Sequence, residues 1–176
     1  MSQRFIEGTL TFGFPDDWYI CRPEETSFHS RHFQNFAGGC KEMDFLAFDP
    51  ASRILWFIEV KDYAANARTK EGELADEVAI KTRDVLAMLP VGGIRDHGIS
   101  QPGKLQIRDF WQSAREAVDM RVVLHCELPA SPSKLFPGVK DSANLQLKLS
   151  QKIRCVDPHP LFTNRDIGHA LPWSVN

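Results

Sequence analysis

Residues 43–63, MDFLAFDPASRILWFIEVKDY, decide the fold that this sequence predicts. They cover most of two predicted strands, Lys41–Phe48 and Arg53–Tyr63, and the DPAS between them is a turn sequence that favours antiparallel pairing. The second strand is apolar on both faces, from Ile54 to Val60. Such a strand belongs in the middle of a sheet that is covered on both sides.

Two helix patterns flank this hairpin in the sequence. Residues 69–89 have apolar side chains at helical spacing, with acidic residues crowding the first half, and Pro90 and Gly92-Gly93 end the pattern. An earlier helix begins at Pro23 and stops at Gly38-Gly39. Its predicted apolar face consists of residues at i, i+4 and i+8, which are Phe28, His32 and Phe36.

The remaining elements complete an α/β (α+β) pattern. Further strands are predicted at Thr9–Phe14, Trp18–Cys21, Arg121–Glu127 and, as an edge strand, Ile153–Val156; further helices are predicted at Ile107–Val118 and Ser142–Lys152. This order predicts a central mixed sheet with helices on both faces.

Length and composition indicate one globular domain over residues 1–176. Apolar residues make up 43% and charged residues 25%, which excludes disordered, collagen-like and coiled-coil chains. The net charge of -2 excludes an overall basic coat for nucleic acid, but not a local basic patch. The sequence has neither a run long enough to span a bilayer nor a signal-peptide layout, so we expect a cytoplasmic protein without membrane contact.

The four cysteines are far apart in sequence and form no CxxC pair. We therefore expect them to be reduced and mostly buried. A zinc site that uses Cys155 with His159, or His29 with His32, is the alternative.

Charged residues in the apolar strand point to chemistry. Glu59 and Lys61 share a face because side chains alternate along a strand, and a charge there requires a partner. Asp44, across the hairpin, can approach Glu59 side by side. Two close carboxylates attract Mg²⁺ (Mn²⁺ as a substitute), the carbonyl of Val60 is a further candidate ligand, and Lys61 can hold a metal-bound water. This constellation suits metal-assisted hydrolysis of a phosphodiester.

Asp44, followed after fourteen residues by Glu59-Val60-Lys61, resembles the signature of the PD-(D/E)XK nuclease superfamily, the restriction-endonuclease-like fold. The resemblance covers a core of about residues 15–127, with 128–176 as a helical elaboration. It implies that Asp44 and Glu59 bind magnesium and that Lys61 assists the attacking water. A glutamate of the first helix often joins such sites, which favours Glu25.

The sequence departs from the signature at two points. Met43 stands where the signature has proline, and the Gln-x-x-x-Tyr box of the exonuclease branch is absent from the second helix. The chain also resembles a small bacterial group with this fold, through FPDDW, ETSFHSRHF, WFIEVKDY, VLHCELP and DPHPL. That likeness implies a nuclease but no particular substrate.

Basic residues suggest where nucleic acid would bind. Residues 134–154 contain five basic residues and one acidic residue, and Lys148 and Lys152 are spaced to share a helix face along a phosphate backbone. Lys81 on the preceding helix could contact a phosphate. A solvated helix face is the alternative for all three lysines.

Three hypotheses follow from the sequence. The first is a magnesium-dependent DNA endonuclease or nickase in bacterial DNA processing or defence, with nucleic acid as its partner and a homodimer left open. The second is a catalytically inactive nuclease-fold module that binds nucleic acid or a protein. The third is a zinc-binding regulatory protein.

Overall fold

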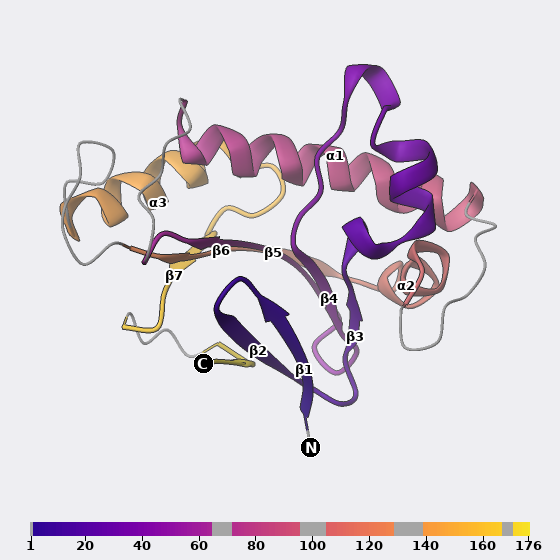
Figure 1. Ribbon diagram of the computed structural model, residues 1–176, viewed down its shortest axis with the longest axis horizontal. Helices are drawn as coiled ribbons and strands as arrows, with labels where there is room; N and C mark the ends of the chain where they lie inside the picture. Colours follow the sequence, from indigo (N-terminus) through magenta and orange to yellow (C-terminus); the bar gives the residue numbers. More distant parts are fainter. Residues whose placement is uncertain (1, 65–71, 96–104, 129–138, 167–170) are drawn as a thin grey trace.

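The computed structural model describes residues 2–64, 72–95, 105–128, 139–166 and 171–176, which form two sheets and a layer of helices (Figure 1). The helices are α1 (Leu74–Arg95), α2 (Ile107–Ala114) and α3 (Val139–Ile153). The strands are β1 (Ser2–Glu7), β2 (Leu10–Pro15), β3 (Tyr19–Cys21), β4 (Phe45–Asp49), β5 (Ile54–Asp62), β6 (Asp119–Glu127), β7 (Leu161–Thr163) and β8 (Ser174–Val175).

The central sheet is mixed and has β5 in its middle. Its five strands have the order β3-β4-β5-β6-β7. The pairs β3–β4 and β4–β5 are antiparallel, whereas β5–β6 and β6–β7 are parallel. All residues of β5 from Leu55 to Val60 are buried, as its two apolar faces predicted. The predicted class, a mixed sheet with helices, is confirmed.

Different structures cover the two faces of the central sheet. One face packs on α1, α2 and α3, which contribute Val85, Phe110 and Leu149 to a common core. The other face packs on a second sheet of order β1-β2-β8, where Phe12 and Trp173 lie in a separate core. The prediction of helices on both faces is therefore wrong for the described residues, because strands from both ends of the chain cover the second face (Figure 1).

The N-terminal hairpin contains one strand that the sequence did not predict. β2 and β3 confirm the predicted strands, but β1 pairs with β2 along its whole length. Gly8 makes the turn with φ of 60°, a left-handed conformation that glycine adopts without strain. No residue of β1 is fully buried. A strand without a buried face does not need alternating apolar residues, and that alternation is the signal by which a strand is predicted from sequence.

α1 continues past the residues predicted to end it. The helix runs through Pro90 and both glycines to Arg95, so the predicted end at Leu89 is wrong. The glycines allow close packing: a Cβ on Gly92 would lie 2.3 Å from Ile107 Cγ2, and one on Gly93 would lie 1.9 Å from Trp111 Cδ1. Glycines at these positions would end an isolated helix. In this fold they allow α2 to approach α1 closely. The predicted start of the helix, before Gly72, lies outside the described residues.

The single helix predicted between Pro23 and Gly38 is wrong, because the chain forms three short turns there. These are the 3-10 turn η1 (Pro23–Glu25), the π-helical turn η2 (His29–Phe33) and the 3-10 turn η3 (Phe36–Gly38). The wider π turn changes the buried face. Phe28 and Phe33 are buried at a spacing of five residues, whereas His32 and Phe36 are exposed.

Residues 128–176 supply strands as well as α3. β7 extends the central sheet and β8 pairs with β2. The predicted edge strand Ile153–Val156 is wrong, because the Ile153 carbonyl accepts the N–H groups of Val156 and Asp157 in a turn that closes α3. Lys134 of the predicted basic stretch lies outside the described residues. None of the helices in the described part of the chain has the length and apolar run needed to cross a membrane.

Candidate functional site

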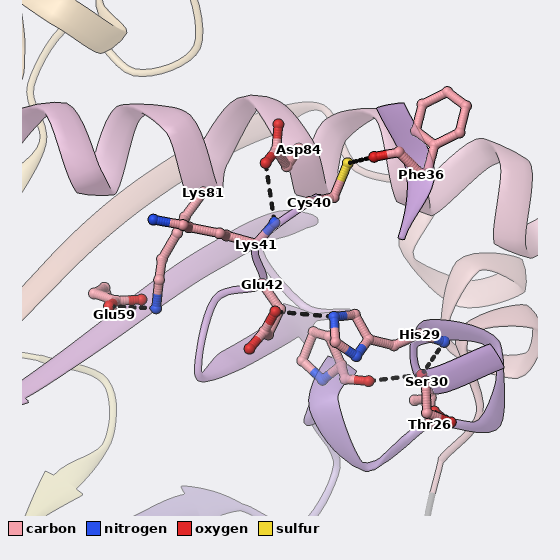
Figure 2. Close-up of polar contacts among 11 residues, drawn as sticks. Thr26, His29, Ser30, Phe36, Cys40, Lys41, Glu42, Glu59, Lys81 and Asp84 are labelled. Carbon is pink, nitrogen blue, oxygen red and sulfur yellow. Dashed lines mark hydrogen bonds and ion pairs between the residues drawn. The ribbon is translucent and has the colours of Figure 1, made fainter. Parts of the chain in front are cut away.

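A buried ion cluster lies between β5 and α1. Glu59 is 0% exposed, and its Oε1 lies 2.5 Å from Lys61 Nζ and 2.6 Å from Lys81 Nζ. Figure 2 shows Lys81 extending from α1 to Glu59 on the strand below. Lys61 also lies 3.3 Å from Glu77 Oε1, one helical turn before Lys81 on α1. One carboxylate oxygen thus accepts from two ammonium groups of different elements.

Asp44 joins this cluster from the start of β4. Phe45 pairs with Ile58 in the antiparallel register, so the preceding residue, Asp44, lies beside Glu59. Asp44 Oδ2 accepts the N–H of Val60 at 2.6 Å. The structure therefore brings Asp44, Glu59 and Lys61 together, at the place where the sequence put them.

Two contacts hold the segment that leads into Asp44. Asp84 of α1, which is buried, accepts the backbone N–H of Lys41 at 3.0 Å. His29 Nε2 lies 2.9 Å from Glu42 Oε2 (Figure 2). The contact with His29 outweighs burial and lowers the pKa of Glu42. Both sides of the segment are thus fixed, which limits the positions that Asp44 can take.

The environment of Glu59 sets its protonation near neutral pH. Burial and the neighbouring Asp44 raise the pKa of Glu59 to about 7, against the opposing effect of Lys81 and Lys61. For Lys61, burial would lower the pKa, but the carboxylates of Glu59, Asp44 and Glu77 outweigh it and raise the pKa above its ordinary value. The cluster can take up or release a proton on Glu59 while Lys61 stays charged.

The carboxylate oxygens predicted to hold magnesium have other partners in the structure. Glu59 Oε1 is bound by two lysines and Asp44 Oδ2 by a backbone N–H, while Glu59 Oε2 has no hydrogen-bond partner among the residues that the structure describes. Within the described ranges, no group of three or more His, Cys, Asp or Glu side chains is arranged to hold a metal ion. Val60 directs its side chain into the core on the opposite face. The magnesium and zinc sites remain predictions.

Glu25 belongs to a second charged group, centred on Arg22. Arg22 lies 2.9 Å from Glu25 and 3.0 Å from Glu24, and it also pairs with Glu7 of β1. Burial and Asp44 raise the pKa of Glu7, with Arg22 opposing them. Glu25, which was predicted to join the site, therefore pairs with Arg22. Glu7 pairs with the same arginine and also lies close enough to Asp44 for the two carboxylates to repel each other.

Lys148 and Lys152, predicted to follow a phosphate backbone, pair with acidic residues near the beginning of α1. Lys148 Nζ lies 2.5 Å from Glu73 Oε1, and Lys152 Nζ lies 2.5 Å from Asp76 Oδ1. α3 lies alongside this part of α1 (Figure 1), which brings the opposite charges together. Lys81, also predicted as a phosphate contact, is instead the second partner of Glu59.

Sequence reasoning missed two acidic residues near the cluster, Glu7 and Glu77. Glu77 precedes Lys81 by four residues, a spacing that places both on one helix face, so the pair could have been recognised together. Glu7 is on the strand that the sequence did not predict, and no local signal marks it.

Comparison with known proteins identifies one similar curated protein and corrects the predicted function. The chain is 30% identical, over 215 aligned positions, to a cysteine–tRNA ligase of Neisseria meningitidis serogroup A. The alignment covers 97% of this chain but 29% of the ligase. No family model matches, and no solved structure matches significantly, so the resemblance to PD-(D/E)XK nucleases stays a prediction. The function predicted from the sequence, metal-dependent hydrolysis of nucleic acid, is contradicted by this match, because the relative is a ligase for cysteine and tRNA.

Proposed function

We propose that this chain is a tRNA-binding accessory module that works together with a cysteine–tRNA ligase. The observation that carries the proposal is the match of nearly the whole chain to less than a third of that ligase. The ligase therefore contains a segment similar to this chain, and most of the ligase lies outside that segment. A module that works with an enzyme acts on the same substrate, and its effective concentration is high where the two are joined.

The distribution of charged residues supports a local RNA-binding surface. The chain as a whole is close to neutral, so an RNA contact requires a region where cations are not paired. Arg31 and Arg95 are exposed, and Arg95 is the last residue of α1, at the end that lies away from α3 (Figure 1). At the other end of α1, Lys148 and Lys152 are already paired with carboxylates. The proposed RNA-binding surface is therefore the one formed by residues 28–36 and the second half of α1.

The buried cluster supports a structural role beneath this surface. Glu59 and its lysines connect β5 to α1, and Asp84 connects α1 to the segment before β4. These contacts fix α1 on the sheet, and α1 in turn carries the exposed residues of the proposed surface. The proposal requires no chemical step at Glu59.

The test is binding of the purified chain to a fluorescently labelled, cysteine-accepting tRNA transcript, measured by anisotropy. We expect saturable binding that weakens as salt rises from about 50 to 200 mM, and weaker binding to a DNA duplex of similar length. Aminoacylation by the Neisseria ligase, with and without added chain, tests the link to the enzyme. An absence of tRNA binding at low salt, together with an unchanged aminoacylation rate, would falsify the proposal.

A further inference from the structure

An aromatic groove lies between residues 28–36 and the second half of α1. It has a volume of about 390 Å³, within the range of small-ligand sites. Its lining residues are Phe28, His32, Phe33, Phe36, Ala87, Val91 and Arg95. This set, hereafter the aromatic groove, contains three phenyl rings, an imidazole and a guanidinium, and none of its described members carries a carboxylate.

Phe36 is held in an exposed position by its backbone. Its side chain is 59% exposed, although a phenylalanine gains most by being buried. Ala37, Gly38 and Gly39 all have positive φ and turn the chain sharply after it. The Phe36 carbonyl accepts a hydrogen bond from Gly39 N at 3.0 Å and another, shown in Figure 2, from Cys40 Sγ at 3.4 Å. These contacts hold the backbone of Phe36 at the surface.

The exposed rings of the aromatic groove are those of Phe36 and His32, and each lies next to a buried phenyl ring, Phe33 or Phe28. Phe33 and Phe36 lie with centroids 6.2 Å apart and an interplanar angle of 17°, so that their faces are nearly parallel. Phe28 and His32 lie 5.7 Å apart at 45°. Val91 of α1, 51% exposed, forms part of the opposite wall. Flat aromatic faces next to a cation are the features by which proteins bind unpaired bases.

We propose that the aromatic groove stacks an unpaired base of RNA on Phe36 and that Arg95 contacts the adjacent phosphate. The proposal rests on the proposed function, which supplies the RNA, and it names the part of the RNA that is bound: a single-stranded loop or end rather than a paired stem. Charge favours this occupant, because Arg95 in the lining and the exposed Arg31, which precedes His32 of the lining in the sequence, suit a polyanion, and the described lining offers no acidic group to repel it.

Substitutions at Phe36 separate base stacking from apolar docking of a protein. Phe36→Leu keeps an apolar side chain but removes the aromatic face, whereas Phe36→Trp keeps and enlarges that face. Leu147→Ala on α3 is the matched control, because Leu147 is 58% exposed and precedes Lys148, which pairs with Glu73 just before α1 begins. Both sites are exposed, and circular dichroism and thermal unfolding establish that each of the three variants is folded.

The probes are the labelled tRNA transcript and a ten-nucleotide single-stranded RNA. We expect Phe36→Leu to weaken both affinities about ten-fold, and Phe36→Trp and Leu147→Ala to leave them unchanged. Arg95→Gln should reduce the slope of log affinity against log salt by about 0.7, the loss of one phosphate contact with a single strand.

Two results would overturn the inference and remain distinguishable from each other. If the tRNA binds with wild-type affinity to Phe36→Leu and to Arg95→Gln, the aromatic groove is not its site, while the proposed function stands. If the wild-type chain binds neither RNA, but Phe36→Ala, unlike Phe36→Leu, reduces binding to the purified ligase, the groove docks an apolar protein segment instead.

Discussion

Lys81 Nζ on α1 lies 2.6 Å from Glu59 Oε1 on β5, and Lys61 Nζ lies 2.5 Å from the same oxygen. Glu59 has no exposed surface, so this contact ties the longest helix to the centre of the sheet inside the protein. Removing one partner of a buried ion pair costs far more than removing an exposed pair, because a charge is left without compensation.

Lys81→Met should therefore destabilise the fold strongly at pH 8. We expect the free energy of unfolding to fall by about 3 kcal/mol, the lower end for a broken buried pair because Lys61 remains. The loss should be smaller at about pH 5.5, where Glu59 can take up a proton. Urea unfolding at both pH values measures this. Lys148→Met, which breaks the more exposed pair with Glu73, is the matched control and should cost about 0.5 kcal/mol. Equal losses of unfolding free energy in Lys81→Met and Lys148→Met would contradict the conclusion that the pair of Lys81 with Glu59 is buried.

Glu59→Gln should change how stability depends on pH. The pKa of Glu59 is about 7 in the folded protein and 4.5 as its ordinary value. Between these values the folded protein binds more protons than the unfolded chain, so rising pH removes stability that Glu59 contributes. The wild-type free energy of unfolding, relative to that of Glu59→Gln, should thus fall by about 3 kcal/mol from pH 4.5 to pH 8. Parallel curves for the two proteins would show that Glu59 keeps an ordinary pKa.

His125 should stay neutral at pH values where an ordinary histidine is charged. It is 1% exposed, and its Nε2 lies 2.9 Å from Glu127 Oε1. Burial lowers the pKa of His125 from 6.5, although Glu127 acts to raise it. We expect an NMR titration of the imidazole to have its midpoint below 6.5. Because the pKa of His125 is lowered in the folded protein, the unfolded chain binds a proton at this residue first, and the fold loses stability as the pH falls below 6.5.

Glu127→Gln provides the control for His125. The substitution removes the charge that raises the pKa, so the midpoint of the His125 titration should move to still lower pH. A midpoint above 6.5 in the wild type, falling to an ordinary value in Glu127→Gln, would mean that the contact with Glu127 outweighs burial.

The sequence was sufficient to predict the central hairpin and the approach of Asp44, Glu59 and Lys61 to one another on it. The alternation along β5 places Glu59 and Lys61 on one face, and the short turn after β4 brings Asp44 beside them. These are local rules, so they needed no knowledge of the rest of the fold. The function inferred from the same three residues was wrong by the match to the ligase, because a short motif gives residue types and spacing but does not specify the reaction.

The parts that failed depend on tertiary contacts or on uncommon backbone geometry. Lys81 reaches Glu59 only because α1 lies across β5, which helical spacing alone does not reveal. In η2 the π turn moved Phe33 into the core and left Phe36 outside, whereas a period of 3.6 residues predicted the reverse for Phe36. The second sheet joins the two ends of the chain, a contact across more than 160 residues.

The glycines of α1 offer a direct test of why that helix does not end where its sequence predicts. Gly93→Ala adds a Cβ that would lie 1.9 Å from Trp111, so α1 and α2 must separate or the indole must move. Alanine favours a helix by about 1 kcal/mol over glycine, but overpacking costs about 1–3 kcal/mol. Because a separation of 1.9 Å is a severe clash, we take the upper part of the overpacking range, about 2–3 kcal/mol, and expect a net loss of about 1–2 kcal/mol in urea unfolding. The exposed Val91→Ala, in the same turn, should change stability by less than about 0.5 kcal/mol.

A double-mutant cycle identifies the source of the loss. Trp111→Leu removes the ring that meets the added Cβ, so in its presence Gly93→Ala should cost at least about 1 kcal/mol less than it does alone. If Gly93→Ala instead stabilises the wild-type background, helix propensity alone governs this position, and the close approach of α1 and α2 does not constrain it. Coupling to Trp111 would show that α1 extends through its glycines because α2 packs directly against them.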